Sequence, residues 1–467
     1  MADRKKNIWN FFEDTEGDKV VWIIVLMLIM ISVLCIFSST SRLLLPGQTR
    51  LDLVKGHLFI VLIGLAIIII CYNIKNINFF RTCSKYGFLV SFILLALLLS
   101  HIDVGPIKSV SRNGARRIIE VYNQQIHVNE VVKVAMVMYL AWAVDAVRRK
   151  EGMRFFKGDS KKQKYLYVYM PFILITLMVL PGSNSAALFT GGIMFLVILF
   201  GGDSGRDLLK LLLLGIAALA VCVGIFSATN SIHKKNEKFP VVFERIGTGI
   251  SRFTGGSTDY ELQAAESPAG STEFYEAIDK IRQPYSAKIA VHQGSLIGKG
   301  PGQSTQRYVV PDISEDYMFS FIIEEYGILG GLLVITLYLS LLARSSIIVR
   351  NCGKDLFAKL TVAGLSLLIS CQAFLHICVN VDIGPMTGQT LPLVSHGAFA
   401  FLCFSVAFGV ILSISRIASN RIAREQRAAD PLVDLSAPQV ENDLADLDAF
   451  ESGNDINEQL SDDEYGI

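Results

Sequence analysis

Acidic residues gather where a long apolar run begins in the last third of the sequence. They are Asp312, Glu315, Asp316, Glu324 and Glu325. A helix N-terminus favours acids, but a cap accounts for only one of them. An unpaired carboxylate two turns inside a membrane helix would be costly. We therefore expect one of these acids to act as a general base toward a membrane-borne substrate.

Glu130 and Lys133 form a second candidate group at the outer end of the fourth apolar run. Their spacing of three places them on one face of a helix. Such charges either form a structural ion pair between helices or present a cation to an anionic substrate, with Glu130 orienting Lys133. Arg116 and Arg117 lie just upstream and favour the second interpretation, although this basic cluster also fits contact with lipid headgroups.

Two segments rich in glycine and proline could bring backbone close to a ligand. Residues 294–302 contain four glycines and Lys299, which is a weak phosphate-binding signal, and a flexible loop is the default interpretation. Residues 380–397 contain two prolines and three glycines, which exclude a regular helix. Irregular backbone at membrane depth is tolerated only where it is buried in protein or lines a cavity. We expect residues 380–397 to wall a cavity.

The composition indicates which elements position these residues. Of 467 residues, 52% are hydrophobic and 18% are charged, against about 25% charged in globular domains. This excludes a disordered protein and argues against an ordinary soluble enzyme. Ten apolar runs predict an all-α polytopic membrane protein. They cover residues 20–38, 57–73, 86–102, 130–147, 165–180, 186–201, 208–227, 317–342, 357–380 and 392–414.

Basic residues in the short loops predict the orientation. Residues 148–164 carry eight Lys and Arg, whereas 181–185 and 381–391 carry none. Because basic loops stay in the cytoplasm, both termini are expected there. Residues 228–316 then form one long external loop between helices 7 and 8, of which 274–296 has helical spacing and could lie along the membrane surface.

Three regions follow from this pattern. Residues 1–19 are a cytoplasmic segment, 20–417 the membrane domain, and 418–467 an acidic tail that we expect to be disordered. The net charge of +1 is an average of unlike parts, since no Lys or Arg follows Arg427. No metal-binding cysteine pattern or P-loop is present, and no nucleic acid partner is predicted.

Four segments, taken in order, resemble the SEDS family, which includes FtsW, RodA and SpoVE. The segments are 113–117 with 127–133, 294–307, 310–327 and 387–398. The resemblance covers residues 20–417 and looks most like the division-type, FtsW-like branch. The sequence departs from the family pattern at His127, Val128, His396, Ala398 and the turn 181–185, which weakens any role for those positions.

The resemblance implies a peptidoglycan glycosyltransferase that polymerises lipid II with inversion. A glycan would pass from polyprenyl diphosphate to the 4-hydroxyl of an acceptor lipid II, with Asp316 as the base. Arg117, Lys133 and Lys299 would stabilise the departing diphosphate. Further substrate-binding residues are implied at Glu130, Ser304, Gln306, Glu324, Ser395 and His396. A divalent cation, Mg or Mn, is also implied, but no ligand set can be read from the sequence.

The same resemblance implies a location and partners. The expected location is the bacterial cytoplasmic membrane, at the division septum. The expected partner is a class B penicillin-binding protein, a transpeptidase, and the tail is a candidate contact for other division proteins. Two alternatives stay open. One is a lipid II flippase, because charges and broken helices inside the membrane also fit a transporter. The other is a non-catalytic division scaffold that acts through the tail.

Overall fold

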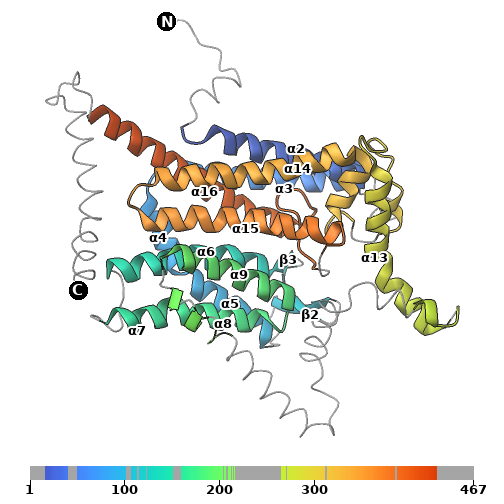
Figure 1. The fold of residues 1–467 in the computed structure, drawn as a ribbon, viewed down its shortest axis with the longest axis horizontal. Coiled ribbons are helices and arrows are strands. Elements are labelled where there is room, and N and C mark those ends of the chain that lie inside the picture. Colours follow the sequence, from blue (N-terminus) through green and yellow to red (C-terminus); the bar gives the residue numbers. More distant parts are fainter. Residues whose placement is uncertain are drawn as a thin grey trace, which may run out of the picture.

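The protein is a bundle of long helices with a small sheet and a crossing helix at one end (Figure 1). The computed structural model describes residues 16–39, 50–100, 107–112, 115–122, 124–150, 159–202, 205–206, 209–211, 213, 215, 264–269, 271–310, 313–383 and 387–428. Most of the predicted N-terminal segment, the tail after residue 428 and most of the seventh predicted run, 208–227, lie outside these residues.

Nine of the ten predicted apolar runs coincide with described helical segments. The helices are α2 (Lys19–Ser39), α3 (Arg50–Asn73), α4 (Ile77–Lys85), α5 (Gly87–Leu99), α6 (Val128–Arg149), α7 (Ser160–Lys164), a π-helix (Tyr165–Tyr169), α8 (Met170–Val179), α9 (Asn184–Phe200), α13 (Thr272–Gly294), a 3-10 helix (Gln306–Tyr308), α14 (Met318–Asn351), α15 (Leu356–Asn380) and α16 (Ala398–Ala428). Six described helices are long and apolar enough to cross a membrane, and α9 is a shorter apolar helix. A multi-pass membrane protein is therefore supported, while the count of ten spans stays a prediction.

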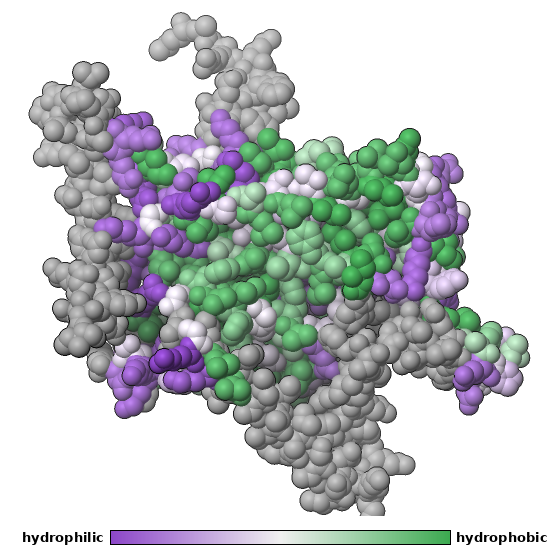
Figure 2. Space-filling model, viewed as in Figure 1, coloured by the Kyte–Doolittle hydropathy of each residue, from purple (hydrophilic) through white to green (hydrophobic). Residues whose placement is uncertain are grey.

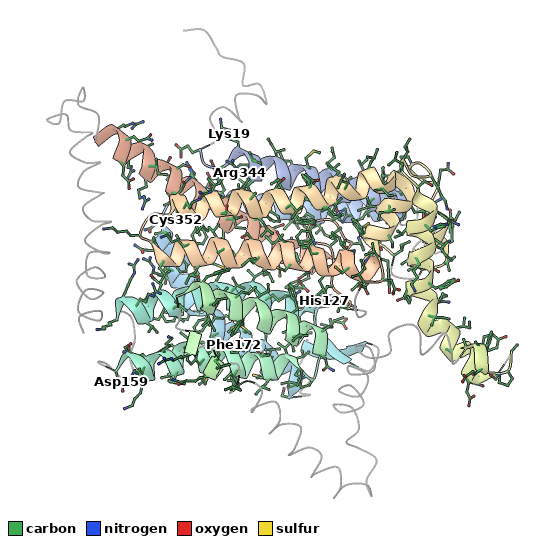
Figure 3. All side chains as sticks on the ribbon, viewed as in Figure 1. Lys19, His127, Asp159, Phe172, Arg344 and Cys352 are labelled. Atoms are coloured by element: carbon green, nitrogen blue, oxygen red, sulfur yellow. The ribbon has the colours of Figure 1, made fainter. Side chains whose placement is uncertain are left out.

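The surface follows this arrangement. Apolar residues cover the middle of the visible face and hydrophilic residues gather toward both ends (Figure 2). Figure 3 places Lys19, Arg344, Cys352 and Asp159 toward one end and His127 toward the other. At the first end, hydrogen bonds from Asn420 and Arg416 lower the pKa of Glu16 below its ordinary value. The polar groups of the predicted site lie toward the opposite end.

The segment between the third and fourth apolar runs, for which the sequence predicts no element, contains a three-stranded antiparallel sheet. Its strands are β1 (Ile107–Arg112), β2 (Ala115–Val121) and β3 (Gln124–His127), in the order β1-β2-β3. The fold is therefore mostly rather than entirely helical. The strands were not predicted because runs of four to seven residues, crowded with basic residues, carry little periodic signal.

Helix α15 lies at the centre of the bundle, between α14 and α6 (Figure 1). It also contacts α16, α9 and α13. Its buried residues include the large apolar side chains Phe357, Leu365 and Leu368, but also Gln372, His376 and Asn380 near its end. A helix packed on so many sides is well placed to hold neighbouring elements in register.

Helix α13 confirms the helical spacing predicted for 274–296, and it crosses the end of the bundle (Figure 1). It leads into the glycine-rich segment, which packs against a break in α14. Gly327 interrupts α14 with a φ of 72°. The backbone N–H groups of Lys299 and Gly300 donate to the carbonyls of Glu324 and Glu325, and Ile328 N–H donates to Ser295. The broken helix therefore satisfies its free backbone groups through this loop.

Candidate active site

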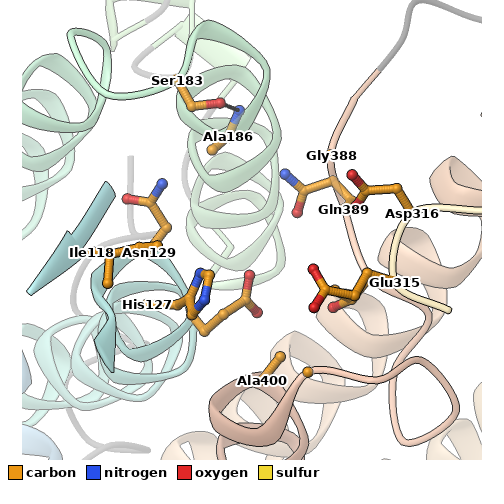
Figure 4. A pocket seen from close by; sticks show the side chains of 13 residues that line it. Ile118, His127, Asn129, Ser183, Ala186, Glu315, Asp316, Gly388, Gln389 and Ala400 are labelled. Carbon is orange, nitrogen blue, oxygen red and sulfur yellow. Dashed lines mark hydrogen bonds between the residues drawn. The ribbon is translucent and has the colours of Figure 1, made fainter. Parts of the chain in front are cut away.

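A polar cavity of about 160 Å³ lies where β2, β3, α6, α9, α16 and the segment before α14 meet (Figure 4). It is lined by Ile118, His127, Asn129, Glu130, Ser183, Ala186, Glu315, Asp316, Gly388, Gln389, Thr390, Gly397 and Ala400. Glu315 and Asp316 face His127 and Asn129 across it (Figure 4). The structure thus brings together two of the predicted site residues, Asp316 and Glu130, from distant parts of the sequence.

Asp316 is held by hydrogen bonds to three successive backbone carbonyls. Asn380 Nδ2 donates to the carbonyl of Asp316 itself (3.1 Å), and Ser395 Oγ donates to that of Glu315 (2.8 Å). The backbone N–H of His396 donates to the Ser314 carbonyl (2.7 Å). These bonds tie the segment before α14 to α15 and to the turn before α16. The backbone that carries Asp316 is therefore fixed.

The segment that the sequence predicts as a cavity wall does line the cavity. Gly388, Gln389 and Thr390 are among its lining residues. A Cβ atom placed on Gly388 would lie 3.6 Å from Asp316 Oδ2, so this backbone runs directly beside the carboxylate. Such close approach agrees with the glycine content of 380–397.

Glu130 and Lys133 are in contact on one face of α6, as their spacing predicts. Lys133 Nζ lies 2.7 Å from Glu130 Oε1, 2.6 Å from Gln372 Oε1 and 2.9 Å from Gln389 Oε1. The Lys133 side chain is 1% exposed and is not among the described residues that line the cavity. Its three N–H donors are matched by three oxygens. The buried Glu130 Oε2, by contrast, has no hydrogen-bond partner among the described residues.

Four other predicted site residues lie in a separate cluster around Glu324. The Glu324 carboxylate accepts from Lys299 Nζ (2.7 Å), Ser304 Oγ (2.5 Å) and both the backbone N–H and the hydroxyl of Thr305 (2.9 Å each). The Gln306 N–H adds a 3.4 Å contact. Among the described residues that line the cavity, none comes from this cluster. The predicted substrate contacts of Lys299, Ser304, Gln306 and Glu324 stay predictions.

Glu325 is bound through one oxygen, and its buried Oε2 has no hydrogen-bond partner among the described residues. Its Oε1 accepts from Ser38 Oγ (2.6 Å) and from the N–H groups of Gly302 (3.1 Å) and Ser304 (3.3 Å). Arg307 Nη1 lies 4.0 Å from the same oxygen. The two glutamates therefore hold the backbone of the glycine-rich segment, for which the default interpretation of the sequence is a flexible loop.

The remaining predicted residues are placed as follows. Ser395 Oγ accepts from the Leu391 N–H (2.9 Å), so this hydroxyl shapes the turn before α16. The His396 ring lies 5.7 Å from that of His57, and His57 Nε2 is 3.0 Å from Ser32 Oγ. Arg117 belongs to β2, but its side chain lies outside the described part of the chain, as does Asp312.

Sequence reasoning missed three buried polar residues of α15, namely Gln372, His376 and Asn380. They bind Lys133, the Gln389 carbonyl and the Asp316 carbonyl, respectively. Their signal was available, because polar residues repeat every four positions within an apolar run, and polar groups inside a membrane span are expensive unless they serve a purpose. Considered one at a time, these polar residues did not stand out, because the run that contains them is otherwise apolar.

This fold and cavity define a class: a multi-pass helical membrane protein with an acid-lined cavity among its helix ends. The chain matches the family model of the cell cycle proteins FtsW, RodA and SpoVE over residues 18–240 and 272–420. The protein belongs to this family, as its four motifs indicate.

Relatives and solved structures agree. A probable peptidoglycan glycosyltransferase FtsW of Enterococcus hirae is 26% identical, with 91% of this chain and 98% of the relative aligned. Stage V sporulation protein E of Bacillus subtilis is 27% identical, with 86% and 98% aligned. The rod shape determining protein RodA of Thermus thermophilus has a similar fold (TM-score 0.52, 18% identity, 86% and 97% covered). So does a chain from a peptidoglycan synthase complex that coordinates polymerization and crosslinking (TM-score 0.56, 17% identity, 86% and 98% covered).

Proposed function

We propose that this protein is a peptidoglycan glycosyltransferase that polymerises lipid II at the outer face of the cytoplasmic membrane during cell division. The observation that carries the proposal is the cavity that Asp316 and Glu130 both line, built from three of the segments that resemble the family. Relatives that align along 86% and 98% of their own length are named probable peptidoglycan glycosyltransferases.

The proposed reaction joins two lipid-linked sugars. Asp316 accepts the proton of the acceptor 4-hydroxyl, and the oxygen of that hydroxyl attacks the anomeric carbon of the donor. The bond from that carbon to the polyprenyl diphosphate breaks, with inversion. A diphosphate is a good leaving group, so no second carboxyl is needed to protonate it, unlike in glycoside hydrolysis. The fixed backbone at Asp316 supports this role, since a base must be held within reach of the proton it removes.

Positive charge for the departing diphosphate is the second requirement. Lys133 and Lys299 are each engaged by a glutamate. We propose that Arg117 and a divalent cation, Mg or Mn, carry most of this charge, while Lys133 holds Glu130 in place. When bound, such a cation would neutralise the diphosphate as a Lewis acid.

The described residues fit a cation that is held by few protein ligands. Glu130 Oε2 is a buried oxygen without a partner among them, and Glu315 and Asp316 line the same cavity. No group of three His, Cys, Asp or Glu converges for a metal within the described residues. Mg²⁺ commonly uses one or two carboxylates together with substrate phosphates and water. Glu130 and Asp316 are our candidates for its ligands.

We further propose ten membrane helices with both termini in the cytoplasm, placing the cavity at the outer face. The eight basic residues of 148–164 support this orientation. A class B penicillin-binding protein is the proposed partner. The fold shared with a chain of a complex that couples polymerization to crosslinking supports this choice. The division septum is the proposed site of action.

The test is polymerisation of lipid II by purified protein, with and without a class B penicillin-binding protein. We expect Asp316→Asn to lower the rate by about 10²–10⁴, the usual contribution of a general base, without changing the unfolding midpoint. Asp382→Asn is the matched control, because Asp382 is an exposed acid in the α15–α16 segment that does not line the cavity.

Two results would contradict the proposal in part or in whole. Polymerisation that persists in Asp316→Asn would show that Asp316 is not the base. Wild-type protein that makes no strands with its partner, yet moves lipid II across liposomes, would favour the flippase.

A further inference from the structure

Helix α15 carries a polar stripe that no predicted role uses. Gln372, His376 and Asn380 are spaced four residues apart, so they lie along one face of the helix over about 12 Å. Each is at most 1% exposed. Buried polar groups in a membrane helix are costly unless fully hydrogen-bonded. Their partners therefore indicate what the stripe does.

Asn380 and His376 bind the first turn of α14. This helix has no side-chain cap of its own at Tyr317, which leaves its first N–H groups in need of acceptors. Phe319 N–H donates to His376 Nε2 (3.3 Å) and Ser320 N–H donates to Asn380 Oδ1 (2.9 Å). Asn380 Nδ2 donates in turn to the Asp316 carbonyl (3.1 Å). Side chains of α15 thus supply acceptors for the first turn of α14, and Asn380 also holds Asp316, which lies two residues before α14 begins.

The bonds of His376 fix its tautomer. A backbone N–H can only donate, so Nε2 must be the acceptor for Phe319 and carry no proton. Nδ1, which lies 2.7 Å from the Gln389 carbonyl, must then carry the proton and donate it. The neutral ring is a bridge between the start of α14 and the 387–390 segment.

Gln372 completes the stripe at the Lys133 side. Its Oε1 accepts from Lys133 (2.6 Å) and its Nε2 donates to the Thr390 carbonyl (3.0 Å). Gln389 is consequently held at both ends, because its side chain binds Lys133 (2.9 Å) while its carbonyl binds His376. The stripe thus binds three lining residues directly, at Asp316, Gln389 and Thr390, and its other bonds hold Lys133 and the first turn of α14.

We propose that Gln372, His376 and Asn380 are positioning residues that set the distance between the Asp316 carboxylate and the Glu130–Lys133 pair. The two groups come from different elements, α6 and the segment before α14, and α15 is in contact with both helices. The inference rests on the proposed function for its catalytic consequence, but its structural part can be tested alone. A displacement of about 1 Å at a reacting group can cost about 100-fold in rate.

The experiment compares three variants of the full chain. His376→Phe keeps a planar aromatic ring but loses both bonds. His376→Asn keeps a donor at the position of Nδ1, so it restores the bond to Gln389 and loses the one to Phe319. Ser366→Ala is the matched control, since Ser366 is also buried in α15 but bonds the Ala363 carbonyl of its own helix.

Two measurements are made on each variant: amide hydrogen exchange over 313–322 and 387–395, and kcat and KM for lipid II. We expect His376→Phe to speed exchange in both segments and to lower kcat by about 10- to 100-fold, with KM within about twofold. His376→Asn should speed exchange only in 313–322 and recover part of kcat. Ser366→Ala should match the wild type in both measurements.

The exchange result does not depend on activity, so a wild type without polymerase activity would reject the proposed function and leave this measurement decisive. Unchanged exchange in His376→Phe, or faster exchange with unchanged kcat, would overturn the positioning role. If His376→Phe does not fold, Gln372→Met takes its place. It removes one of three partners of Lys133 at the other end of the stripe, with the same expected fall in kcat.

Discussion

Two carboxylate clusters, one around Glu324 and one in the cavity, differ in how many hydrogen bonds their oxygens accept. Around Glu324, at least four hydrogen bonds from Lys299, Ser304 and Thr305 surround a carboxylate that is 0% exposed. In the cavity, Glu130 keeps a buried oxygen without a partner among the described residues, and Asp316 lines the hollow.

The difference teaches which acids are available for chemistry. A saturated carboxylate is well solvated by the protein, so it is a poor base and a good anchor. A carboxylate whose backbone is fixed but whose oxygens face a cavity can accept a proton or a cation. The acid at the glycine-rich segment therefore stabilises the fold of that segment, whereas the acids of the cavity are available for chemistry.

The largest effect on stability is expected when Lys133, the cation of the Glu130–Lys133 pair, is replaced. Lys133→Met leaves the Glu130 carboxylate, 13% exposed, without its counter-charge. Breaking one side of a buried pair costs about 3–5 kcal/mol. Chemical unfolding in detergent should show this loss, and adding Glu130→Gln should recover much of it. A loss below about 1 kcal/mol would mean that the pair is solvated and not comparable with the Glu324 cluster.

The next effect separates two glycines of the same segment. Gly298 has a φ of +87° and a Cβ there would lie 2.3 Å from the Glu325 carbonyl oxygen, whereas Gly302 has a φ of +80° with open space around it. Gly298→Ala should cost about 2–5 kcal/mol from strain and crowding, and Gly302→Ala about 1–2 kcal/mol from strain alone. Equal losses in an unfolding experiment would contradict the tight packing of the loop on α14.

The sequence predicted most of the helices that carry the two clusters, but not the contacts between distant residues that place each acid in its cluster. Apolar runs and caps are local patterns, so α2, α6, α14 and α15 could be placed from residue order alone. The contact of Glu130 with Lys133 followed from spacing. Which acids share a cavity is different, because it depends on contacts between residues far apart in the chain.

Asp316 and Glu324 show this limit well. Both lie in one motif-like segment, and the sequence could not assign them to separate clusters, since the break at Gly327 and the fold of 298–305 decide where Glu324 points. The β-strands at 107–127 were missed for the opposite reason, because short strands carry too little pattern. Local periodicity gave the helices, while tertiary contacts set the site.

A smaller effect tests whether Glu324 anchors the loop or binds substrate. Glu324→Gln keeps the shape but removes the charge that Lys299 and Thr305 satisfy, which should cost about 1–3 kcal/mol of unfolding free energy. The kcat of the folded variant should stay within a few-fold of wild type. A kcat that falls 100-fold at unchanged stability would instead support the substrate contact that the family resemblance implies.

The smallest effect concerns an exposed ion pair at the cavity end of the bundle. Lys288 Nζ of α13 lies 2.7 Å from Asp382 Oδ2, and the side chains are 37% and 41% exposed. Water screens such a pair, so its coupling energy should be about 0.2–1 kcal/mol and should shrink as salt is raised. A double-mutant cycle with Lys288→Ala and Asp382→Ala measures it directly. A coupling near that of Glu130 and Lys133 would show that exposure does not separate the pairs, and the contrast between saturated, open and solvent-screened carboxylates would lose its physical basis.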